Sequence, residues 1–226
     1  MPSPNAITTP MTESRSRARF PRNPNTAAAI TAPDLSAGRW DGARVTMALV
    51  DWSDPAGGAA MLGGGTIGAI ESGDGGFAAE LRGAAAALER PVVEATSPGC
   101  RATLGDRRCR VAMAGRRRIA RVLAVAGRVL TLDGAEPVAN GWGEGVLRWI
   151  GGENGGLEQA IVASDGARVT LVAPPRFPVA SGALVQVEEG CDRTIATCAG
   201  RFGNAANFRG EPYLPGIDLL TRYPGA

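Results

Sequence analysis

Four cysteines, arranged as two short loops, constrain this chain more than any other feature of its sequence. One loop runs from Cys100 to Cys109 and the other from Cys191 to Cys198, and each opens with a Gly-Cys pair. The chain contains no histidine, so these thiols are its only strong ligands for a soft metal. We expect the fold to bring the two loops together into one site.

Three occupants of such a site are compatible with the spacing. Structural zinc is usually held by tighter C-x2-4-C knuckles, although two wider loops can still present four thiolates. Two disulfides tolerate any spacing but are rare in a reducing cytosol. A [4Fe-4S] cluster is larger than a single ion and suits wider loops. Glycines beside Cys100 and Cys191 would let backbone N–H groups approach cluster sulfurs.

Arginines surround both loops and would offset the negative charge of an iron–sulfur cluster. The six nearest in sequence are Arg101, Arg107, Arg108, Arg110, Arg193 and Arg201. All 24 basic residues of the 226-residue chain are arginine, which together with abundant Ala and Gly is typical of a GC-rich genome. The net charge of +2 does not predict nucleic-acid binding. The sequence shows neither a bilayer-spanning run nor a signal-peptide core, which predicts a bacterial cytosolic origin.

The lack of histidine also excludes most hydrolase chemistry. A Ser-His or Cys-His nucleophile pair cannot form, and there is no histidine general base. Asp51 and Asp54 in VDWSDP are a close carboxylate pair, but Asp-Pro in a polar stretch is more typical of a turn than of a catalytic site. A hydrolase that relies on a nucleophile–histidine pair is therefore excluded, and we expect no small-molecule substrate.

Hydropathy patterns divide the chain into three parts. Residues 1–29 are proline-rich and aperiodic, which predicts a disordered or atypical tail. Residues 30–95 contain a short helix at 34–38, three strand patterns within 43–52, 63–72 and 75–83, and one helical turn at 84–88. Three strands cannot close a barrel, so this region predicts a partial β domain.

Residues 96–226 are expected to form a second β domain. Six strand patterns fall at 118–125, 128–133, 145–150, 157–164, 168–172 and 183–188. Short strands with frequent turns predict a small barrel or sandwich, with the first cysteine loop before its first strand and the second after its last. From Arg201 the tail is irregular and aromatic. It carries Phe202, Phe208, Tyr213 and Tyr223, which would form a small satellite core or cover the cysteine loops.

Two segments resemble a known family. GCxxxLGDxRCxV at 99–111 and GCDRTIATCAGRFGNAANFRGEPYLPGID at 190–218 are similar to the C-terminal part of tail hub proteins of gene transfer agents and siphovirus-type prophages. Further matches are DLSAGRWDGA, VDWSDP, GTIG and AELRG, so the resemblance covers about residues 30–226. The cysteine pairing is also similar to that of the lambdoid phage tail-tip protein, which holds a [4Fe-4S] cluster.

The resemblance implies a mainly β, non-enzymatic structural protein, with an incomplete N-terminal hub region, a barrel-like cluster domain and an irregular C-terminal tail. It implies that Cys100, Cys109, Cys191 and Cys198 are the four cluster ligands, with zinc as the alternative occupant. Redox use of the cluster is a further alternative.

The same resemblance implies a place in a particle. A homotrimer would sit between a distal tail ring and a large fibre-bearing protein, with DNA passing through without sequence-specific binding. Assembly in the bacterial cytoplasm would precede incorporation at the tail tip. Family members have a longer N-terminal β region, so we expect either a mis-assigned start or a hub domain completed by a partner.

Overall fold

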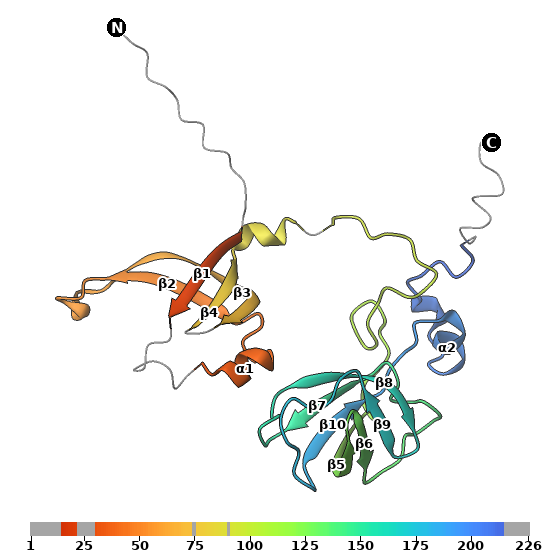
Figure 1. The fold of residues 1–226 in the computed structure, drawn as a ribbon. Helices are drawn as coiled ribbons and strands as arrows, with labels where there is room; N and C mark the ends of the chain where they lie inside the picture. Colours follow the sequence, from red (N-terminus) through yellow and green to blue (C-terminus); the bar gives the residue numbers. More distant parts are fainter. Residues whose placement is uncertain (1–14, 22–29, 74–75, 90, 215–226) are drawn as a thin grey trace, which may run out of the picture. The chain divides into compact units, whose positions relative to one another are not determined.

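The computed structural model describes residues 15–21, 30–73, 76–89 and 91–214. The chain separates into two compact units, Met1–Val93 and Glu94–Ala226, which are described individually. Both are built mainly from antiparallel strands (Figure 1), so the predicted mainly β class is confirmed. Among the described residues, no helix is long and apolar enough to cross a bilayer.

The first unit is a four-stranded antiparallel sheet in the order β1-β4-β3-β2. Its strands are β1 (Arg15–Pro21), β2 (Arg44–Val50), β3 (Ala59–Gly73) and β4 (Gly76–Arg82). A short helix, α1 (Ala32–Ser36), precedes β2, and two 3-10 turns, η1 (Pro55–Gly57) and η2 (Ala84–Ala87), follow β2 and β4. α1 begins earlier than expected because Thr31 caps it, accepting a 3.2 Å hydrogen bond from the Asp34 N–H.

Within the expected disordered or atypical tail, Arg15–Pro21 form a strand that the sequence analysis did not predict. These residues pair with β4 along its whole length, from Arg15 opposite Arg82 to Pro21 opposite Gly76. The sequence RSRARFP alternates basic with smaller or apolar residues, a period of two that suits a strand. Its hydrogen-bonding partner lies more than fifty residues further along the chain, so the pattern alone did not single it out. The remaining residues of the expected tail, 1–14 and 22–29, lie outside the described part of the chain.

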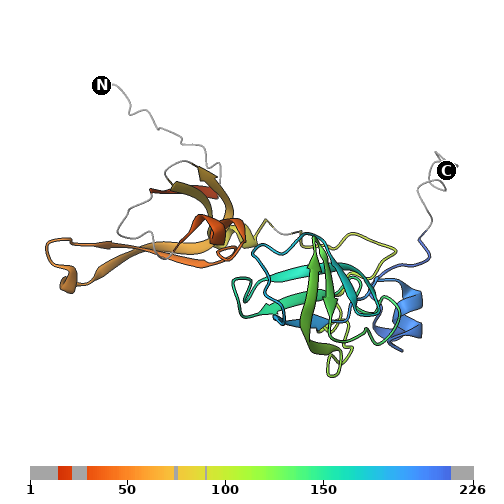
Figure 2. The ribbon, with the colours of Figure 1, turned by 60° about the horizontal axis from the view of Figure 1, so that its bottom comes forward.

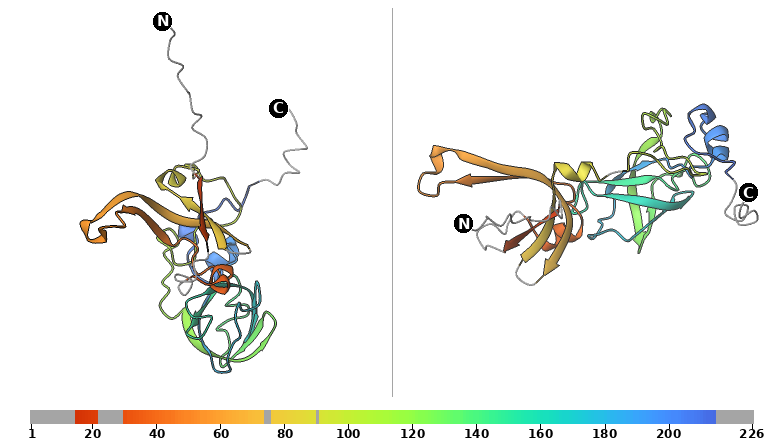
Figure 3. Two further views of the ribbon diagram at one scale, coloured as in Figure 1. Left: turned by 60° about the vertical axis from the view of Figure 1, so that its left-hand side comes forward. Right: turned by 90° about the horizontal axis from the view of Figure 1, so that it is seen from above.

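A long β-hairpin, formed by β2 and the first half of β3, projects from this sheet (Figures 2 and 3). Nearly every side chain near its tip is exposed, including large apolar ones. These are Met47, Leu49, Val50, Trp52, Met61 and Leu62, with Trp52 91% exposed. Among the residues of this unit whose side chains the structure describes, the buried apolar ones are Leu35, Ile67 and Ala79. The unit therefore presents much of its apolar surface to its surroundings.

The second unit is a closed six-stranded barrel in the order β10-β5-β6-β9-β8-β7. Its strands are β5 (Arg117–Ala126), β6 (Val129–Leu132), β7 (Val146–Ile150), β8 (Glu158–Asp165), β9 (Arg168–Leu171) and β10 (Leu184–Glu188). All six match the predicted strands, and the barrel alternative is confirmed over the sandwich. β10 closes the barrel by pairing with both β5 and β7, so no barrel strand is left as a free edge.

Alternating side chains fill the barrel interior. In β7, for example, Leu147 and Trp149 are buried while Val146, Arg148 and Ile150 are exposed. The buried set is Ala120, Val122, Leu130, Leu132, Trp142, Leu147, Trp149, Ile161, Val169, Leu171, Val185 and Val187. This alternation of buried apolar and exposed side chains explains why the strands could be predicted from the sequence.

Two tight hairpins set the strand register. The β5–β6 turn places Gly127 at a φ of 59°, and the β8–β9 turn places Gly166 at 58°. Glycine adopts this left-handed region without steric cost, and a positive φ at the first turn residue suits a two-residue β-hairpin. After β10 the chain forms α2 (Ile195–Gly200) and a 3-10 turn, η3 (Ala205–Asn207). α2 was not predicted.

Candidate metal centre in the cysteine loops

Both cysteine loops leave the same end of the barrel. β5 begins at Arg117, which pairs with Glu188 at the end of β10. The first loop lies before β5, and the second follows β10 directly. Their backbones meet where the Cys100 N–H donates a 2.8 Å hydrogen bond to the Arg193 carbonyl. The predicted convergence of the two loops is thus present in the backbone.

The four thiols are free and largely shielded from solvent. Cys109 and Cys198 are buried, with exposed fractions of 9% and 7%, while Cys100 and Cys191 are half-buried. Burial raises the pKa of Cys191 and of Cys198, and the neighbouring cysteines raise both further. Asp192 also raises the pKa of Cys191, against a hydrogen bond from the Arg193 backbone that lowers it. Cys191 and Cys198 therefore resist ionisation unless a cationic group joins the thiols.

Asp106 organises the first loop. Its carboxylate accepts hydrogen bonds from the backbone N–H groups of Thr103 at 2.9 Å, Arg108 at 2.8 Å and Cys109 at 2.6 Å. These backbone bonds, the one from Cys109 foremost, lower the pKa of Asp106. The carboxylate therefore holds the backbone that carries Cys109 in one conformation.

Asp192 plays the matching part in the second loop. It accepts from the Thr194 N–H and hydroxyl, both at 2.9 Å, and from the Thr197 hydroxyl at 2.7 Å. Burial opposes its charge, but these bonds outweigh burial and lower its pKa. Thr194 in turn caps α2 by accepting from the Thr197 N–H at 3.2 Å. Cys198 thus projects from a short helix that the preceding loop stabilises.

A buried carboxylate fastens the second loop to the barrel. Glu189, 8% exposed, accepts from Arg116 at 2.7 Å and from Arg201 at 2.6 Å. The guanidinium carbon of each arginine lies 4.9 Å from the centre of the Phe202 ring. One charged cluster thereby joins the start of β5, the end of β10 and the chain after α2.

The arginines divide into two groups. Arg101, Arg108 and Arg201 form ion pairs with glutamates, so much of their charge is already balanced. Arg107, Arg110 and Arg193 are exposed, and no ion pair involves them within the described residues. Arg110 and Arg193 also adopt positive φ angles of 62° and 60°. Such strained residues cluster at functional sites, and left-handed residues beside a turn help aim backbone N–H groups at anions.

The two glycines beside the cysteines differ in their surroundings within the protein chain. A side chain on Gly190 would collide with the backbone of Gly143 and Gly145, so Gly190 is required by packing against the turn before β7. Gly99 is uncrowded, and its N–H donates to the Ser97 hydroxyl at 3.2 Å rather than to a sulfur. Hydrogen bonds to sulfur come from the Arg209 N–H, 3.4 Å from Cys100 Sγ, and from Asn204 Nδ2, 3.7 Å from Cys109 Sγ.

The donor set fits a soft, cationic group. Within the part of the chain that the structure describes, no three histidine, cysteine, aspartate or glutamate side chains are placed to hold one metal ion. The four thiols nevertheless lie close enough to raise the pKa values of Cys191 and Cys198. Thiolates carried by two loops that are joined through their backbones are suitable ligands for a group larger than one ion.

Other sequence candidates have structural roles. Asp51 is exposed and accepts from the Ser53 N–H and hydroxyl, at 2.9 and 2.6 Å, as a turn residue does. Among the tail aromatics, Phe202 stacks with arginines and Phe208 is half-buried, whereas Tyr213 is 91% exposed. Tyr223 lies outside the described residues.

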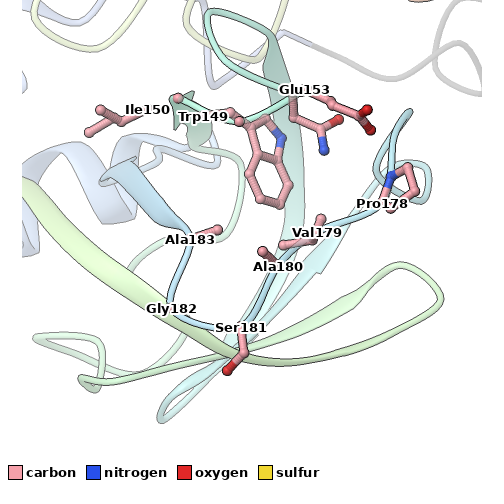
Figure 4. A pocket seen from close by; sticks show the side chains of 12 residues that line it. Trp149, Ile150, Glu153, Pro178, Val179, Ala180, Ser181, Gly182 and Ala183 are labelled. Carbon is pink, nitrogen blue, oxygen red and sulfur yellow. The ribbon is translucent and has the colours of Figure 1, made fainter.

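A pocket of about 630 Å³ lies between the end of β7 and the segment that leads into β10 (Figure 4). Residues 149–154 and 178–183 line it, and Figure 4 shows the Trp149 ring facing Val179 and Ala180. The Asn154 amide beside it is engaged with the backbone of Phe177, at 2.9 and 3.1 Å. The pocket includes none of the cysteines and forms no part of the candidate metal centre.

Comparison with known proteins supports the family that the motifs suggested. A family described as "Baseplate hub protein, N-terminal attachment domain" matches residues 23–112, and "Phage conserved hypothetical protein BR0599" matches residues 140–218. The first match includes Cys100 and Cys109, and the second includes Cys191 and Cys198. No curated protein matches the sequence.

A solved structure matches both units. It is a chain from the "Virion of native gene transfer agent (GTA) particle", with a TM-score of 0.75 and 36% sequence identity over 88% of this chain and 71% of that one. Baseplate hub proteins and virion components are structural, so this protein has a structural and not an enzymatic role. The chain belongs to the family of tail hub proteins of phages and gene transfer agents.

Proposed function

We propose that this protein is a hub subunit of a phage-like tail tip and that a [4Fe-4S] cluster staples its C-terminal unit. The observation that carries the proposal is the meeting of two cysteine loops at one end of a closed barrel, in a chain of the tail hub family. The subunit would contribute to tail assembly and to the path by which DNA leaves the particle.

Cys100, Cys109, Cys191 and Cys198 would hold the cluster. Bound there, the cluster would cross-link two segments ninety residues apart and supply the positive charge that four clustered thiolates need. The Arg209 N–H already donates to Cys100 Sγ at 3.4 Å, the kind of contact that tunes and stabilises cluster sulfurs. Four cysteine ligands leave no iron site open, which favours a structural role over catalysis.

The first unit would attach the subunit to its neighbours. Its β2–β3 hairpin exposes an apolar surface that a monomeric protein rarely leaves uncovered. We propose a homotrimer, flanked by a distal tail ring and a fibre-bearing protein, with DNA passing through without sequence-specific contacts. The protein would fold in the bacterial cytoplasm and then join the tail tip.

Metal analysis of the full-length chain purified without oxygen tests the cluster. We expect a brown protein with broad visible absorbance and about four irons and four sulfides per chain. Cys198→Ser should lose the colour and the iron. Ala199→Ser, which alters the exposed neighbouring position in α2, should retain both. A colourless protein that holds zinc would overturn the cluster in favour of a structural zinc site.

Assembly of particles tests the attachment role of the hairpin. Trp52→Ser combined with Leu62→Ser should leave the barrel folded but sharply reduce the amount of protein that enters particles. Leu88→Ser removes an apolar side chain that is 87% exposed elsewhere on the same unit, and should leave incorporation normal. Equal incorporation of the two variants would argue against the hairpin as the attachment surface.

A further inference from the structure

Residues 204–211, here called the C-terminal clasp, contact both cysteine loops. The Asn204 N–H donates to the Cys198 carbonyl at 2.9 Å, at the end of the second loop. Further along, the Arg101 N–H donates to the Arg209 carbonyl at 3.1 Å, and the Arg209 N–H approaches Cys100 Sγ at 3.4 Å. The clasp therefore lies against the first loop while it is anchored to the second.

Glu211 secures the far end of the clasp. Its N–H donates to the Ser97 carbonyl at 2.8 Å, and its carboxylate accepts from the Ser97 N–H at 2.9 Å. The same carboxylate forms two hydrogen bonds with the Arg101 guanidinium. Gly210 lies so close to Gly99 that a side chain there would come within 2.6 Å of the Gly99 carbonyl oxygen. The clasp thus runs in close backbone contact with the residues just before Cys100.

Asn204 joins the two loops directly. Besides its backbone bond to Cys198, its side-chain Nδ2 donates to the Cys109 carbonyl at 2.6 Å and lies 3.7 Å from Cys109 Sγ. Asn207 donates through its own Nδ2 to Asn204 Oδ1 at 2.7 Å. Because Oδ1 is occupied in this way, the amide orientation places Nδ2, and not the oxygen, toward Cys109. Asn204 therefore contacts the last cysteine of each loop, Cys109 through its side chain and Cys198 through its backbone N–H.

We propose that Asn204 is the positioning residue that holds Cys109 against Cys198, and that the clasp must be in place before the four thiols can share one group. The inference rests on the proposed cluster for its purpose, but its contacts exist in the protein chain alone. Asn204 does not itself act as a ligand; it sets the place of two that do.

Thiol alkylation of the metal-free, full-length chain tests the proposal. Asn204→Leu keeps the approximate size of the side chain and removes its side-chain hydrogen bonds without adding charge, while the backbone bond to Cys198 can remain. We expect iodoacetamide to modify Cys109 about tenfold faster in Asn204→Leu, because a buried thiol reacts through local opening that lost hydrogen bonds make easier. Mass spectrometry of each cysteine-containing peptide measures the rate.

Two variants complete the comparison. Ala206→Leu adds the same side chain at an exposed position of the clasp and leaves the Asn204 amide intact, so it should react as the wild type does. Asn207→Leu removes only the bond that orients Asn204, and should give an intermediate rate. An unchanged near-ultraviolet signal from the buried Trp142 and Trp149 would show that the barrel remains folded in each variant.

The outcomes separate this inference from the cluster itself. Equal alkylation of Cys109 in Asn204→Leu and Ala206→Leu would overturn the role of Asn204, whatever the protein binds. Faster alkylation in a protein that never takes up iron would support the role of Asn204 and reject the cluster. If the wild type loads iron, Asn204→Leu should also retain less iron after gel filtration than Ala206→Leu.

Discussion

Arg101 and Glu211 form a bidentate ion pair, with Nη1–Oε2 at 2.6 Å and Nη2–Oε1 at 2.8 Å. Hydrogen bonding from Arg101, followed by that from the Ser97 N–H, lowers the pKa of Glu211 to about 2. The pair fixes the residue after Cys100 to the end of the clasp, more than a hundred positions later. It is therefore a long-range contact on which the geometry of the cysteine loops depends.

Glu211→Gln should lower the denaturant midpoint of the second unit, because neutral glutamine cannot keep the two charge-assisted bonds to Arg101. Glu158→Gln is the matched control. Its partner Arg148 is about half exposed, as is Glu158 itself, and exposed pairs of this kind contribute little. Urea unfolding followed by tryptophan fluorescence measures both. If Glu158→Gln shifted the midpoint as much as Glu211→Gln does, the Arg101–Glu211 pair would contribute no more to stability than an exposed ion pair, contrary to this prediction.

Glu136 predicts a pH dependence of barrel stability. Burial opposes its charge, but hydrogen bonds from Ser164 and from the N–H groups of Gly166, Asn140 and Gly141 prevail and lower its pKa from 4.5. A carboxylate with a lowered pKa stabilises the fold above its unfolded value, and this stabilisation is lost as pH falls through the folded value. Wild type should therefore exceed Glu136→Gln in stability at pH 7, and the difference should shrink below about pH 4.5. Chemical unfolding at several pH values tests this; a constant difference would contradict it.

Gly190→Ala should destabilise the second unit by about 1–3 kcal/mol, because the added methyl group would collide with the backbone of Gly143 and Gly145. Gly200→Ala, in the same segment, is the control. A methyl group there meets nothing within 4 Å, and in α2 it should be neutral or stabilise by up to about 1 kcal/mol. In thermal unfolding, Gly190→Ala should have a lower melting temperature than the wild type, and Gly200→Ala an equal or higher one. Similar melting temperatures would show that the turn before β7 can yield.

Leu147→Ala should cost about 2–5 kcal/mol of the free energy of unfolding, because Leu147 is fully buried in the barrel and its loss leaves a cavity. Ile119→Ala removes a similar side chain that is 63% exposed on β5, and should change stability by no more than about 0.5 kcal/mol. Equilibrium unfolding in urea distinguishes them. A small effect of Leu147→Ala would mean that the barrel is less well packed than the structure indicates.

Local pattern accounts for what could be predicted about the fold. The barrel strands alternate buried and exposed side chains, and glycines such as Gly127 and Gly166 mark their hairpins. The positions of the six strands could therefore be predicted from the sequence. β1 and α2 were missed because neither carries a strong local signal. β1 depends on pairing with β4, and α2 is a short helix that Thr194 and Asp192 hold in place.

For the candidate site, the four thiols and their division into two loops can be read from the sequence, because the chain contains no histidine and no further cysteine. How the loops meet became apparent only in the folded protein. Asn204, Glu211 and the backbone of Arg193 connect segments about a hundred residues apart, and such contacts leave no periodic trace in a sequence. The structure also shows that several arginines near the cysteine loops are already paired with glutamates. The sequence could not show this, because an ion pair depends on distance in space and not along the chain.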